Sequence, residues 1–432
     1  MKRLSIAALV LIFVQPVFAQ FKNIKLAELS GEVFPPAGPS IAINHKNPDN
    51  IVAGVEKDRA FYTKDGGATW LESKLQSPFG MGGYPTLISD SKGGLYFFHL
   101  SDPNGKGQAD DAWLDRIICQ KSSDEGATWK SGEPFGYQPA KNQYRAWASV
   151  AFKKQDLYAT WTQFDKYGAT DTTLHSNIMF SLSDSDGKKW SKPVRLNQFS
   201  GDCALSDNTT TGAMTAVDVK GRIFATWARA GSIYFDRSYD NGKTWLSQDL
   251  PLTQQQGGWA MEIRGIKHTN GTPSFVIDNS PSRYHGSLYI VWADQRNGAD
   301  DTDVWMIRSG NGGDNWSPPL RINKDERPGT DQFMPWVAVD QTTGYVYIVY
   351  YDRRNYDDTQ TDVYLAYSAD GGSSFGEAKI SESPFTPDSN FSPEHINIAA
   401  YKGVVAPIWT RTDNGKISVI TSIIKDADFQ KK

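Results

Sequence analysis

Arginines and carboxylates recur in polar segments that lie between runs of β-forming residues. A guanidinium group presents a planar set of N–H donors that fits both oxygens of a carboxylate, so several arginines together suit an acidic ligand. The candidate ligand-binding residues are Arg59, Arg145, Arg264, Asp294, Arg296, Asp352, Arg353 and Arg411. This set predicts an anion-binding site if the fold brings the segments together.

Structural interpretations compete with this functional one. The Asp294–Arg296 pattern and the Asp352–Arg353 pair follow similar β runs, and such pairs could simply join neighbouring repeats of the chain. Glu262 lies two residues before Arg264, and the alternation of a strand would place both side chains on one face. They could then form an ion pair or a catalytic unit.

Metal binding has weak support in the sequence. The six histidines lack the spacing of a zinc site, and the two cysteines, Cys119 and Cys203, could form at most one disulfide, which the sequence leaves open. The acidic runs 300–303 and 357–358 could bind Ca²⁺ through oxygen ligands or remain solvated. We therefore expect no cofactor, with Ca²⁺ as the alternative.

The composition indicates one large globular protein without a nucleic-acid partner. Of 432 residues, 39% are hydrophobic, which is enough to bury a large core. The 45 basic and 49 acidic residues give a net charge of −4, so the basic excess needed for nucleic acid or an anionic membrane is missing. The 38 Gly, 22 Pro and 14 Trp predict many short strands and turns, with aromatic surface for sugars or packing.

The N-terminus has the pattern of a secretory signal peptide. Lys2 and Arg3 precede an apolar run that ends at Val14, and Ala19 closes a small-residue cleavage site. This pattern predicts a signal peptide over residues 1–19 and a mature domain over residues 20–432. Later segments contain no apolar run long enough to cross a bilayer. We expect a secreted or periplasmic monomer without membrane insertion.

A short motif repeats six times with spacings between 55 and 71 residues, which is the signature of a repeat architecture. In order, the copies read TKDGGATW, SSDEGATW, SDSDGKKW, SYDNGKTW, SGNGGDNW and SADGGSSF. An Asp side chain can accept N–H groups of a tight turn, while Gly supplies a positive φ angle. The third copy has its Asp displaced to 184 or 186. The motif resembles the Asp box of the sialidase and BNR-repeat β-propellers.

Three predicted strands, named A, B and C, precede each copy of the motif, and a fourth strand, D, follows it. This order predicts an all-β propeller of four-stranded blades with the Asp boxes at the C–D turns. Counting A–B–C units gives seven blades, with six as the alternative. The seventh unit lacks a box and a D strand, so residues 21–29 are predicted to supply its outer strand. The D–A and B–C loops then share the face that carries the site.

The resemblance to sialidases implies a function and specific roles. Sialidases bind the substrate carboxylate through three arginines, use a tyrosine activated by a glutamate as nucleophile, and an aspartate as acid/base. Carried over, this implies anion binding by Arg264, Arg353 and Arg411, a Glu262–Tyr356 nucleophilic pair and Asp58 as acid/base.

The implied function is a secreted sialidase-like glycoside hydrolase that acts on acidic sugar termini of a glycan. The Arg-Ile-Pro segment near the N-terminus of sialidases is absent here, where the chain reads GPSIAINHKNP. Two alternatives therefore stay open. One is another carbohydrate-active propeller, either a polysaccharide lyase or an arabinan-type hydrolase, and the other is a non-catalytic propeller that binds glycan or protein.

Overall fold

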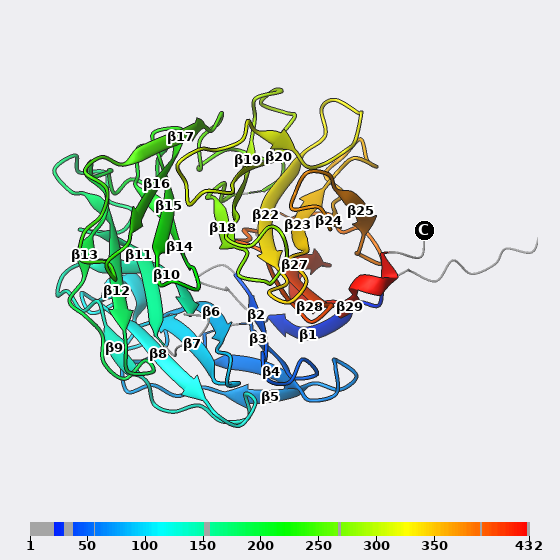
Figure 1. The fold of residues 1–432 in the computed structure, drawn as a ribbon. Helices are drawn as coiled ribbons and strands as arrows, with labels where there is room; N and C mark the ends of the chain where they lie inside the picture. Colours follow the sequence, from blue (N-terminus) through cyan, green and yellow to red (C-terminus); the bar gives the residue numbers. More distant parts are fainter. Residues whose placement is uncertain are drawn as a thin grey trace, which may run out of the picture.

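Seven antiparallel sheets stand around a common axis in the computed structural model (Figure 1). The structure describes residues 21–29, 38–55, 57–150, 156–266, 269–388 and 391–429, so the predicted signal peptide lies outside the described residues. Each sheet is one blade, and its strands run from A beside the axis to D at the rim. The seven-bladed all-β fold predicted from the repeats is confirmed.

The blades follow one another along the chain. Blades 1 and 2 contain β2 (Ser40–Ile43), β3 (Ile51–Gly54), β4 (Arg59–Thr63), β5 (Leu71–Lys74), β6 (Gly83–Ser89), β7 (Leu95–Leu100), β8 (Ile117–Ser122) and β9 (Glu133–Phe135). Blades 3 and 4 contain β10 (Asn142–Val150), β11 (Leu157–Phe164), β12 (Ser176–Ser183), β13 (Val194–Arg195), β14 (Thr211–Val217), β15 (Ile223–Arg229), β16 (Ser232–Ser238) and β17 (Leu250–Gln254). Blades 5 and 6 contain β18 (Ser274–Ile277), β19 (Leu288–Asp294), β20 (Asp303–Ser309), β21 (Leu320–Arg321), β22 (Gln332–Val339), β23 (Val346–Asp352), β24 (Asp362–Ser368) and β25 (Gly376–Lys379).

The seventh blade joins the two ends of the chain. Its strands β26 (Asn397–Tyr401), β27 (Val404–Asp413) and β28 (Lys416–Thr421) come from the C-terminal part, and β1 (Ile24–Leu29) supplies the outer strand. The short β29 (Ile424–Lys425) adds a further pairing to β27. Ile24 pairs with Thr421 and Leu29 with Ile417 in antiparallel register. The predicted closure by the N-terminal segment is confirmed, and it covers an edge of β28 that would otherwise be unpaired.

The core lies within and between the blades, where the B strands are buried on both faces. Four indoles occupy equivalent places in these strands and are at most 1% exposed: Trp161, Trp227, Trp292 and Trp409. Truncating such a buried ring to alanine typically costs about 3–5 kcal/mol. Side chains also tie adjacent A strands together near the axis, because Ser40 Oγ accepts from the Leu87 amide and Thr86 Oγ1 donates to the Ala146 carbonyl.

The repeated motif forms the turn between strands C and D. The Oδ1 atoms of Asp65, Asp124, Asp240 and Asp370 each accept a hydrogen bond of 2.9 Å from the amide four residues later. In the third copy Ser185 Oγ takes that place and accepts from Lys189, whereas Asp186 bonds Tyr96 and Lys121. The expected displaced Asp is therefore replaced by a serine.

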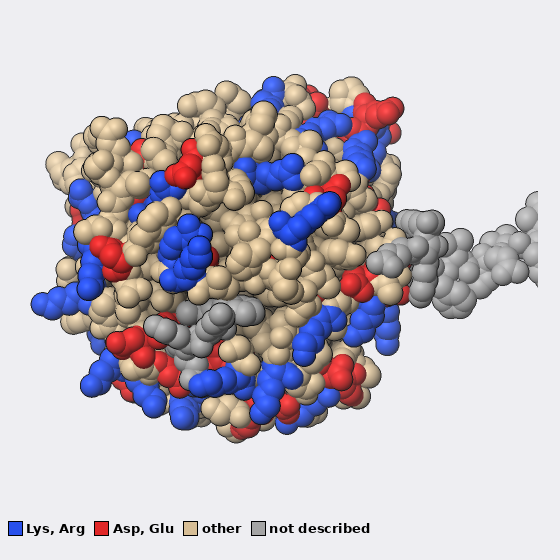
Figure 2. All heavy atoms as spheres, in the orientation of Figure 1, with Lys and Arg blue, Asp and Glu red and all other residues tan. Residues whose placement is uncertain are grey.

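Charge is mixed on the molecular surface. Figure 2 shows Lys and Arg side chains interspersed with Asp and Glu across the face in view. Within the described residues, no helix is long and apolar enough to cross a membrane. The two cysteines, Cys119 and Cys203, are buried free thiols.

Candidate functional site

A cavity of about 700 Å³ opens among the D–A and B–C loops. Its walls come from blades 2, 3, 4 and 7 and from the long loop between blades 4 and 5, so loops from around the ring converge on it. The lining includes Tyr84, Gln108, Tyr144, Tyr167, Leu205, Thr211, Trp259, Glu262, Arg264, Asn270 and Glu394. We call this space the axial cavity. Aromatic walls with a few converging polar groups are typical of small-molecule and sugar sites.

Bulges at the start of two A strands direct side chains toward the cavity floor. Tyr84 is the second residue of β6 with φ 59°, and Arg145 lies in β10 with φ 45°. The pairing register of both strands shifts at these residues, between Gly83 and Thr86 and between Tyr144 and Trp147. Such bulges leave a residue out of the ladder and redirect its side chain. The same bulge recurs in β14 at Gly212 and in β22 at Met334, so it is a repeated feature of the A strands, and the residue types placed there distinguish the floor.

The floor holds a tyrosine, an arginine and a glutamate in mutual contact. Arg145 Nη2 forms an ion pair with Glu394 Oε2, and Tyr144 Oη donates to the same oxygen over 3.1 Å. The guanidinium carbon lies 5.6 Å from the ring centre of Tyr84 and 5.4 Å from that of Tyr144. Arg145 is 6% exposed. One carboxylate therefore serves both a phenol and a buried cation, and we call these three residues the floor triad.

Burial keeps the floor tyrosines protonated. It raises the pKa of Tyr144 well above its ordinary value, although the positive charge of Arg145 partly opposes the shift. Burial likewise raises the pKa of Tyr84, whose hydroxyl interacts with those of Tyr144 and Tyr167. A phenol in this environment loses its proton only when a base accepts it. Glu394 is the carboxylate placed to do so.

One wall of the cavity is formed by residues 259–266 of the loop between blades 4 and 5, and hydrogen bonds hold both ends of this segment. Trp259 Nε1 donates to the Ser206 carbonyl over 2.9 Å, which fixes the half-buried indole against the cavity. At the other end, Arg264 Nη2 donates to the Asp358 carbonyl, and Arg353 Nη1 donates to the Arg264 carbonyl over 2.7 Å. Glu262 and Arg264 therefore stand at the cavity rim on a supported backbone.

The structure brings only part of the predicted site together. Glu262 and Arg264 line the cavity, and the buried Arg145 lies behind it in contact with the lining residues Tyr144 and Glu394. Arg353 is 1% exposed and contacts Asp331. Of the three arginines predicted to converge, Arg264 and Arg353 are in contact through the hydrogen bond from Arg353 to the Arg264 carbonyl. Arg411 is held by Asp413 at 2.6 Å, and neither it nor Arg353 lines the cavity.

The remaining predicted residues have partners elsewhere or lie apart from the lining. Tyr356 donates to Asp362 over 2.8 Å rather than to Glu262, and Arg59 pairs with Glu72 at 2.9 Å. Asp58 lies in the β3–β4 loop and does not line the cavity.

The two Asp–Arg pairs have structural partners within their own blades. Arg296 Nε donates to Asp294 over 2.8 Å, and the Trp292 indole donates to the same carboxylate. In the next blade Arg354, not Arg353, completes the pattern by donating to Asp352 over 2.8 Å. The predicted Asp352–Arg353 pair is therefore corrected, since Arg353 points to the neighbouring loop.

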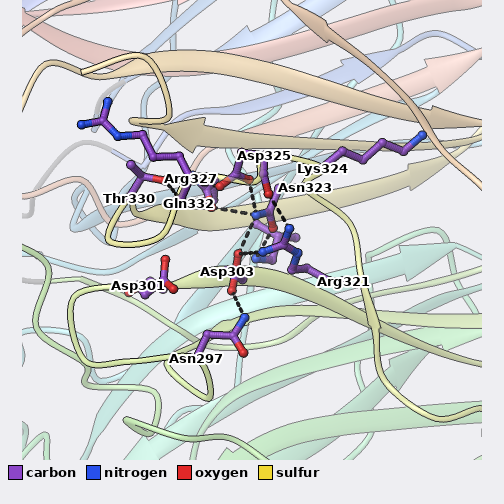
Figure 3. Close-up of polar contacts among 12 residues, drawn as sticks. Asn297, Asp301, Asp303, Arg321, Asn323, Lys324, Asp325, Arg327, Thr330 and Gln332 are labelled. Carbon is purple, nitrogen blue, oxygen red and sulfur yellow. Dashed lines mark hydrogen bonds and ion pairs between the residues drawn. The ribbon is translucent and has the colours of Figure 1, made fainter. Parts of the chain in front are cut away.

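The acidic run near 303 is saturated with hydrogen-bond donors (Figure 3). Asp303 is 1% exposed, and its carboxylate accepts from the side-chain amides of Asn297 and Asn323, each over 2.6 Å, and from Arg321 over 3.3 Å. Asp301 stands apart and accepts from the Gly329 amide. Among the described residues, no group of three or more His, Cys, Asp or Glu side chains is arranged to hold a metal ion.

The sequence placed Tyr167 and Glu394 in loops of the predicted face but assigned no role to them, nor to Tyr84 and Tyr144. Tyr84, Tyr144 and Tyr167 look like ordinary strand or loop aromatics, and Glu394 is separated from Tyr144 by 250 residues. A usable signal was nevertheless present, because Tyr144 and Arg145 are polar groups at the start of an A strand where apolar residues are expected.

The seven-bladed ring is similar to solved propellers of low sequence identity. An α-L-arabinofuranosidase of Fusarium graminearum aligns with a TM-score of 0.51 and 15% identity over 77% of this chain and 92% of that chain. An ulvan lyase, described as a polysaccharide lyase, aligns at 0.51 and 12% over 93% and 96%. A sialidase of Streptococcus pneumoniae aligns at 0.50 and 10% over 80% and 68%.

These identities show a shared fold alone. No protein-family model matches the sequence, and no curated protein matches it. The solved neighbours nevertheless include glycoside hydrolases and a polysaccharide lyase on the same propeller fold. A fold of this kind hosts many activities, so the function must be argued from the site.

Proposed function

We propose that the protein is an exported carbohydrate-active propeller that binds an acidic sugar of a glycan in the axial cavity and cleaves its glycosidic bond. The observation that carries the proposal is the floor triad, in which Tyr144 and Arg145 share Glu394. Tyr84, Tyr167 and Trp259 supply aromatic walls for a sugar ring.

The first candidate reaction is sialidase-like hydrolysis. The Tyr144 oxygen forms a bond to the anomeric carbon while the bond to the leaving oxygen breaks. The phenolic proton moves to Glu394, and the leaving oxygen takes a proton from Glu262 at the mouth of the axial cavity. Water then attacks the anomeric carbon, gives one proton to Glu262, and releases Tyr144, which recovers its proton from Glu394.

A neutral phenol has a specific advantage in this reaction. A carboxylate nucleophile would be repelled by the acid group of the sugar, whereas Tyr144 is held neutral by burial until Glu394 takes its proton. Arg145 lies directly behind the lining residues Tyr144 and Glu394, where its positive charge favours an acidic ligand in the cavity. Arg264 at the rim provides a second cation for the same ligand.

The second candidate reaction is elimination at a uronic acid. It is favoured by two protonated tyrosines on one floor, with the rings of Tyr84 and Tyr144 5.0 Å apart. Tyr144, once deprotonated by Glu394, would remove the proton next to the uronate carboxylate. The electrons form a C=C bond as the glycosidic bond breaks, and the leaving oxygen takes a proton from Tyr84. Arg145 would neutralise the carboxylate during this step.

A substrate screen separates these possibilities. The wild-type protein is offered sialosides, uronic acid polysaccharides and arabinosides, and the products are analysed for reducing sugar and for an unsaturated uronate. Reducing ends without unsaturation support hydrolysis, and unsaturated ends support elimination. Binding of acidic glycans without any product would contradict both reactions and leave a glycan-binding propeller.

The cellular setting and oligomeric state belong to the same proposal. The signal-peptide pattern of residues 1–19 supports export, to the periplasm or beyond the cell. We also propose that the exported protein acts as a monomer, because the ring is closed within one chain by β1. Size-exclusion chromatography with light scattering tests the oligomeric state, and fractionation tests the location.

A further inference from the structure

A cluster of three buried rings lies beneath the floor of the axial cavity. The ring centres of Trp147 and Trp336 are 4.5 Å apart, and His395 lies 5.1 Å and 5.3 Å from them. Both indoles also line an axial channel of about 270 Å³ formed by the A strands of all seven blades. The cluster therefore lies at the wall of the channel, and its members Trp147 and His395 are close in sequence to the residues of the floor triad.

The cluster connects the two chain segments that supply the floor triad. Trp147 follows Arg145 by two residues on β10, and His395 directly follows Glu394 ahead of β26. The Trp147–His395 contact thus sets how far the segment carrying Tyr144 and Arg145 stands from the segment carrying Glu394. These segments belong to blades 3 and 7, which are not adjacent in the ring.

His395 is buried beside the floor triad with little polar contact. It is 4% exposed, its imidazole has the Pro39 backbone as a hydrogen-bond partner, and no side chain among the described residues bonds either ring nitrogen. The Nε atom of Arg145 is buried without a partner among the described residues. Unsatisfied buried polar atoms cost stability. The position of His395 is therefore decided mainly by its ring contacts with the two indoles.

The space for the imidazole is created by one glycine. A Cβ atom added at Gly38 would lie 2.4 Å from His395 Cε1, 2.6 Å from its Nδ1 and 3.3 Å from Glu394 Cβ. Such distances are far below van der Waals contact, so a side chain at residue 38 must displace His395. Gly38 has no positive φ, and alanine fits its backbone conformation. A substitution here therefore displaces mainly His395, and its Cβ also presses on Glu394 Cβ, without replacing any member of the floor triad.

We propose that His395 is a positioning residue that, with Trp147 and Trp336, holds Glu394 at the distance at which it serves both Tyr144 and Arg145. The proposal rests on the proposed function of the floor triad. The imidazole, whose pKa is lowered by burial, packs as a neutral ring against both indoles and fixes the backbone of the residue before it. Misplacing a reacting group by about 1 Å can cost about 100-fold in rate.

The test is the substitution Gly38→Ala, with Gly376→Ala as the matched control. Gly376 lies in the outer strand β25, and a Cβ added there would lie 2.4 Å from Cζ of Tyr367 in the neighbouring strand β24. This substitution therefore creates an equally close ring contact away from the cavity. We expect both variants to lose similar thermal stability. The Gly38→Ala variant should lose about 10- to 100-fold in kcat with little change in KM, while Gly376→Ala keeps the wild-type kcat.

A double variant separates displacement from a general packing defect. In His395→Ala the clash with the imidazole is gone and only the 3.3 Å approach to Glu394 Cβ remains. Adding Gly38→Ala should then reduce kcat far less than it does in the wild type, which is a non-additive result expected of two residues acting through one contact. Equal kcat in the Gly38→Ala and Gly376→Ala variants, or additive losses, would overturn the positioning role alone. A wild-type protein without turnover on any glycan would overturn the proposed function and this role with it.

Discussion

Carboxylates have different roles at the outer rim of the propeller and at its axis. At the rim, the Asp-box carboxylates are exposed or half-buried and are engaged by neighbouring amides and hydroxyls, and these hydrogen bonds lower the pKa of Asp65 and Asp240 to about 2. At the axis, Glu394 is shared by a buried arginine and a protonated tyrosine on a strained backbone. The repeated feature stabilises the fold, and the feature that departs from the repeat carries the chemistry.

The largest effect should follow from changing the axial carboxylate. Glu394→Gln keeps the shape of the side chain but removes the base for Tyr144, and loss of a general base typically lowers kcat by about 100- to 10,000-fold. It also leaves Arg145 without its anion, so the melting temperature should fall. Steady-state kinetics on the best glycan, corrected for the folded fraction, checks this. Unchanged kcat would remove the functional side of the comparison.

A smaller effect is expected from substitution of Arg264, and none from substitution of Arg411, although the sequence suggested the same role for both. Arg264 lines the axial cavity, whereas Arg411 is held by Asp413 outside it. Arg264→Ala should raise KM for acidic sugars about tenfold, the size of one lost hydrogen bond to a charged group, and should affect neutral sugars less. Arg411→Ala is the control and should bind like the wild type. Equal losses in both variants would contradict the placement of the site.

At the rim, substitution should change stability and leave activity alone. Asp65→Ala removes the acceptor for the amide and the hydroxyl of Thr69. We expect the melting temperature to fall by on the order of 2 °C, because one exposed turn contributes little to a large domain. Turnover per folded molecule should match the wild type, and a large loss of kcat at unchanged stability would break the contrast between rim and axis.

The smallest effect is a pH dependence of that same stability. Because hydrogen bonding lowers the folded-state pKa of Asp65 from 3.8 to about 2, its contribution is fully present above about pH 4 and is lost as the pH falls towards 2. The difference in melting temperature between the wild type and Asp65→Ala should therefore shrink over this interval. A difference that stays constant from pH 5 to pH 2 would mean that the carboxylate charge does not matter.

Most of the fold could be predicted because it repeats. The motif spacing, the strand order and the missing D strand of blade 7 predicted seven blades and the closure by β1, since each repeat reports the same local physics several times. The third copy was predicted less well. There Ser185 replaces the acid through its hydroxyl, and a rule written for carboxylates does not include that substitution.

The site could be predicted only in outline. The sequence indicated the face and, on it, Glu262 and Arg264, which line the cavity, because D–A and B–C loops converge near the axis of any propeller. It also indicated Arg145, which lies behind the cavity against Glu394. The pairing of Tyr144 with Glu394 was missed, since it depends on bulges at Tyr84 and Arg145 and on contact between non-adjacent blades. Strand periodicity describes regular ladders and carries no signal for a residue that leaves the ladder.

The most direct test compares two tyrosines that sequence and structure rank differently. Tyr144 donates to Glu394 at the cavity floor, whereas Tyr356 donates to Asp362 outside the cavity lining. The measurement is kcat per folded molecule for Tyr144→Phe and Tyr356→Phe on the best glycan substrate. Our account predicts a loss of at least about 100-fold for Tyr144→Phe and a change within about twofold for Tyr356→Phe. Full turnover in Tyr144→Phe, or the larger loss in Tyr356→Phe, would contradict it.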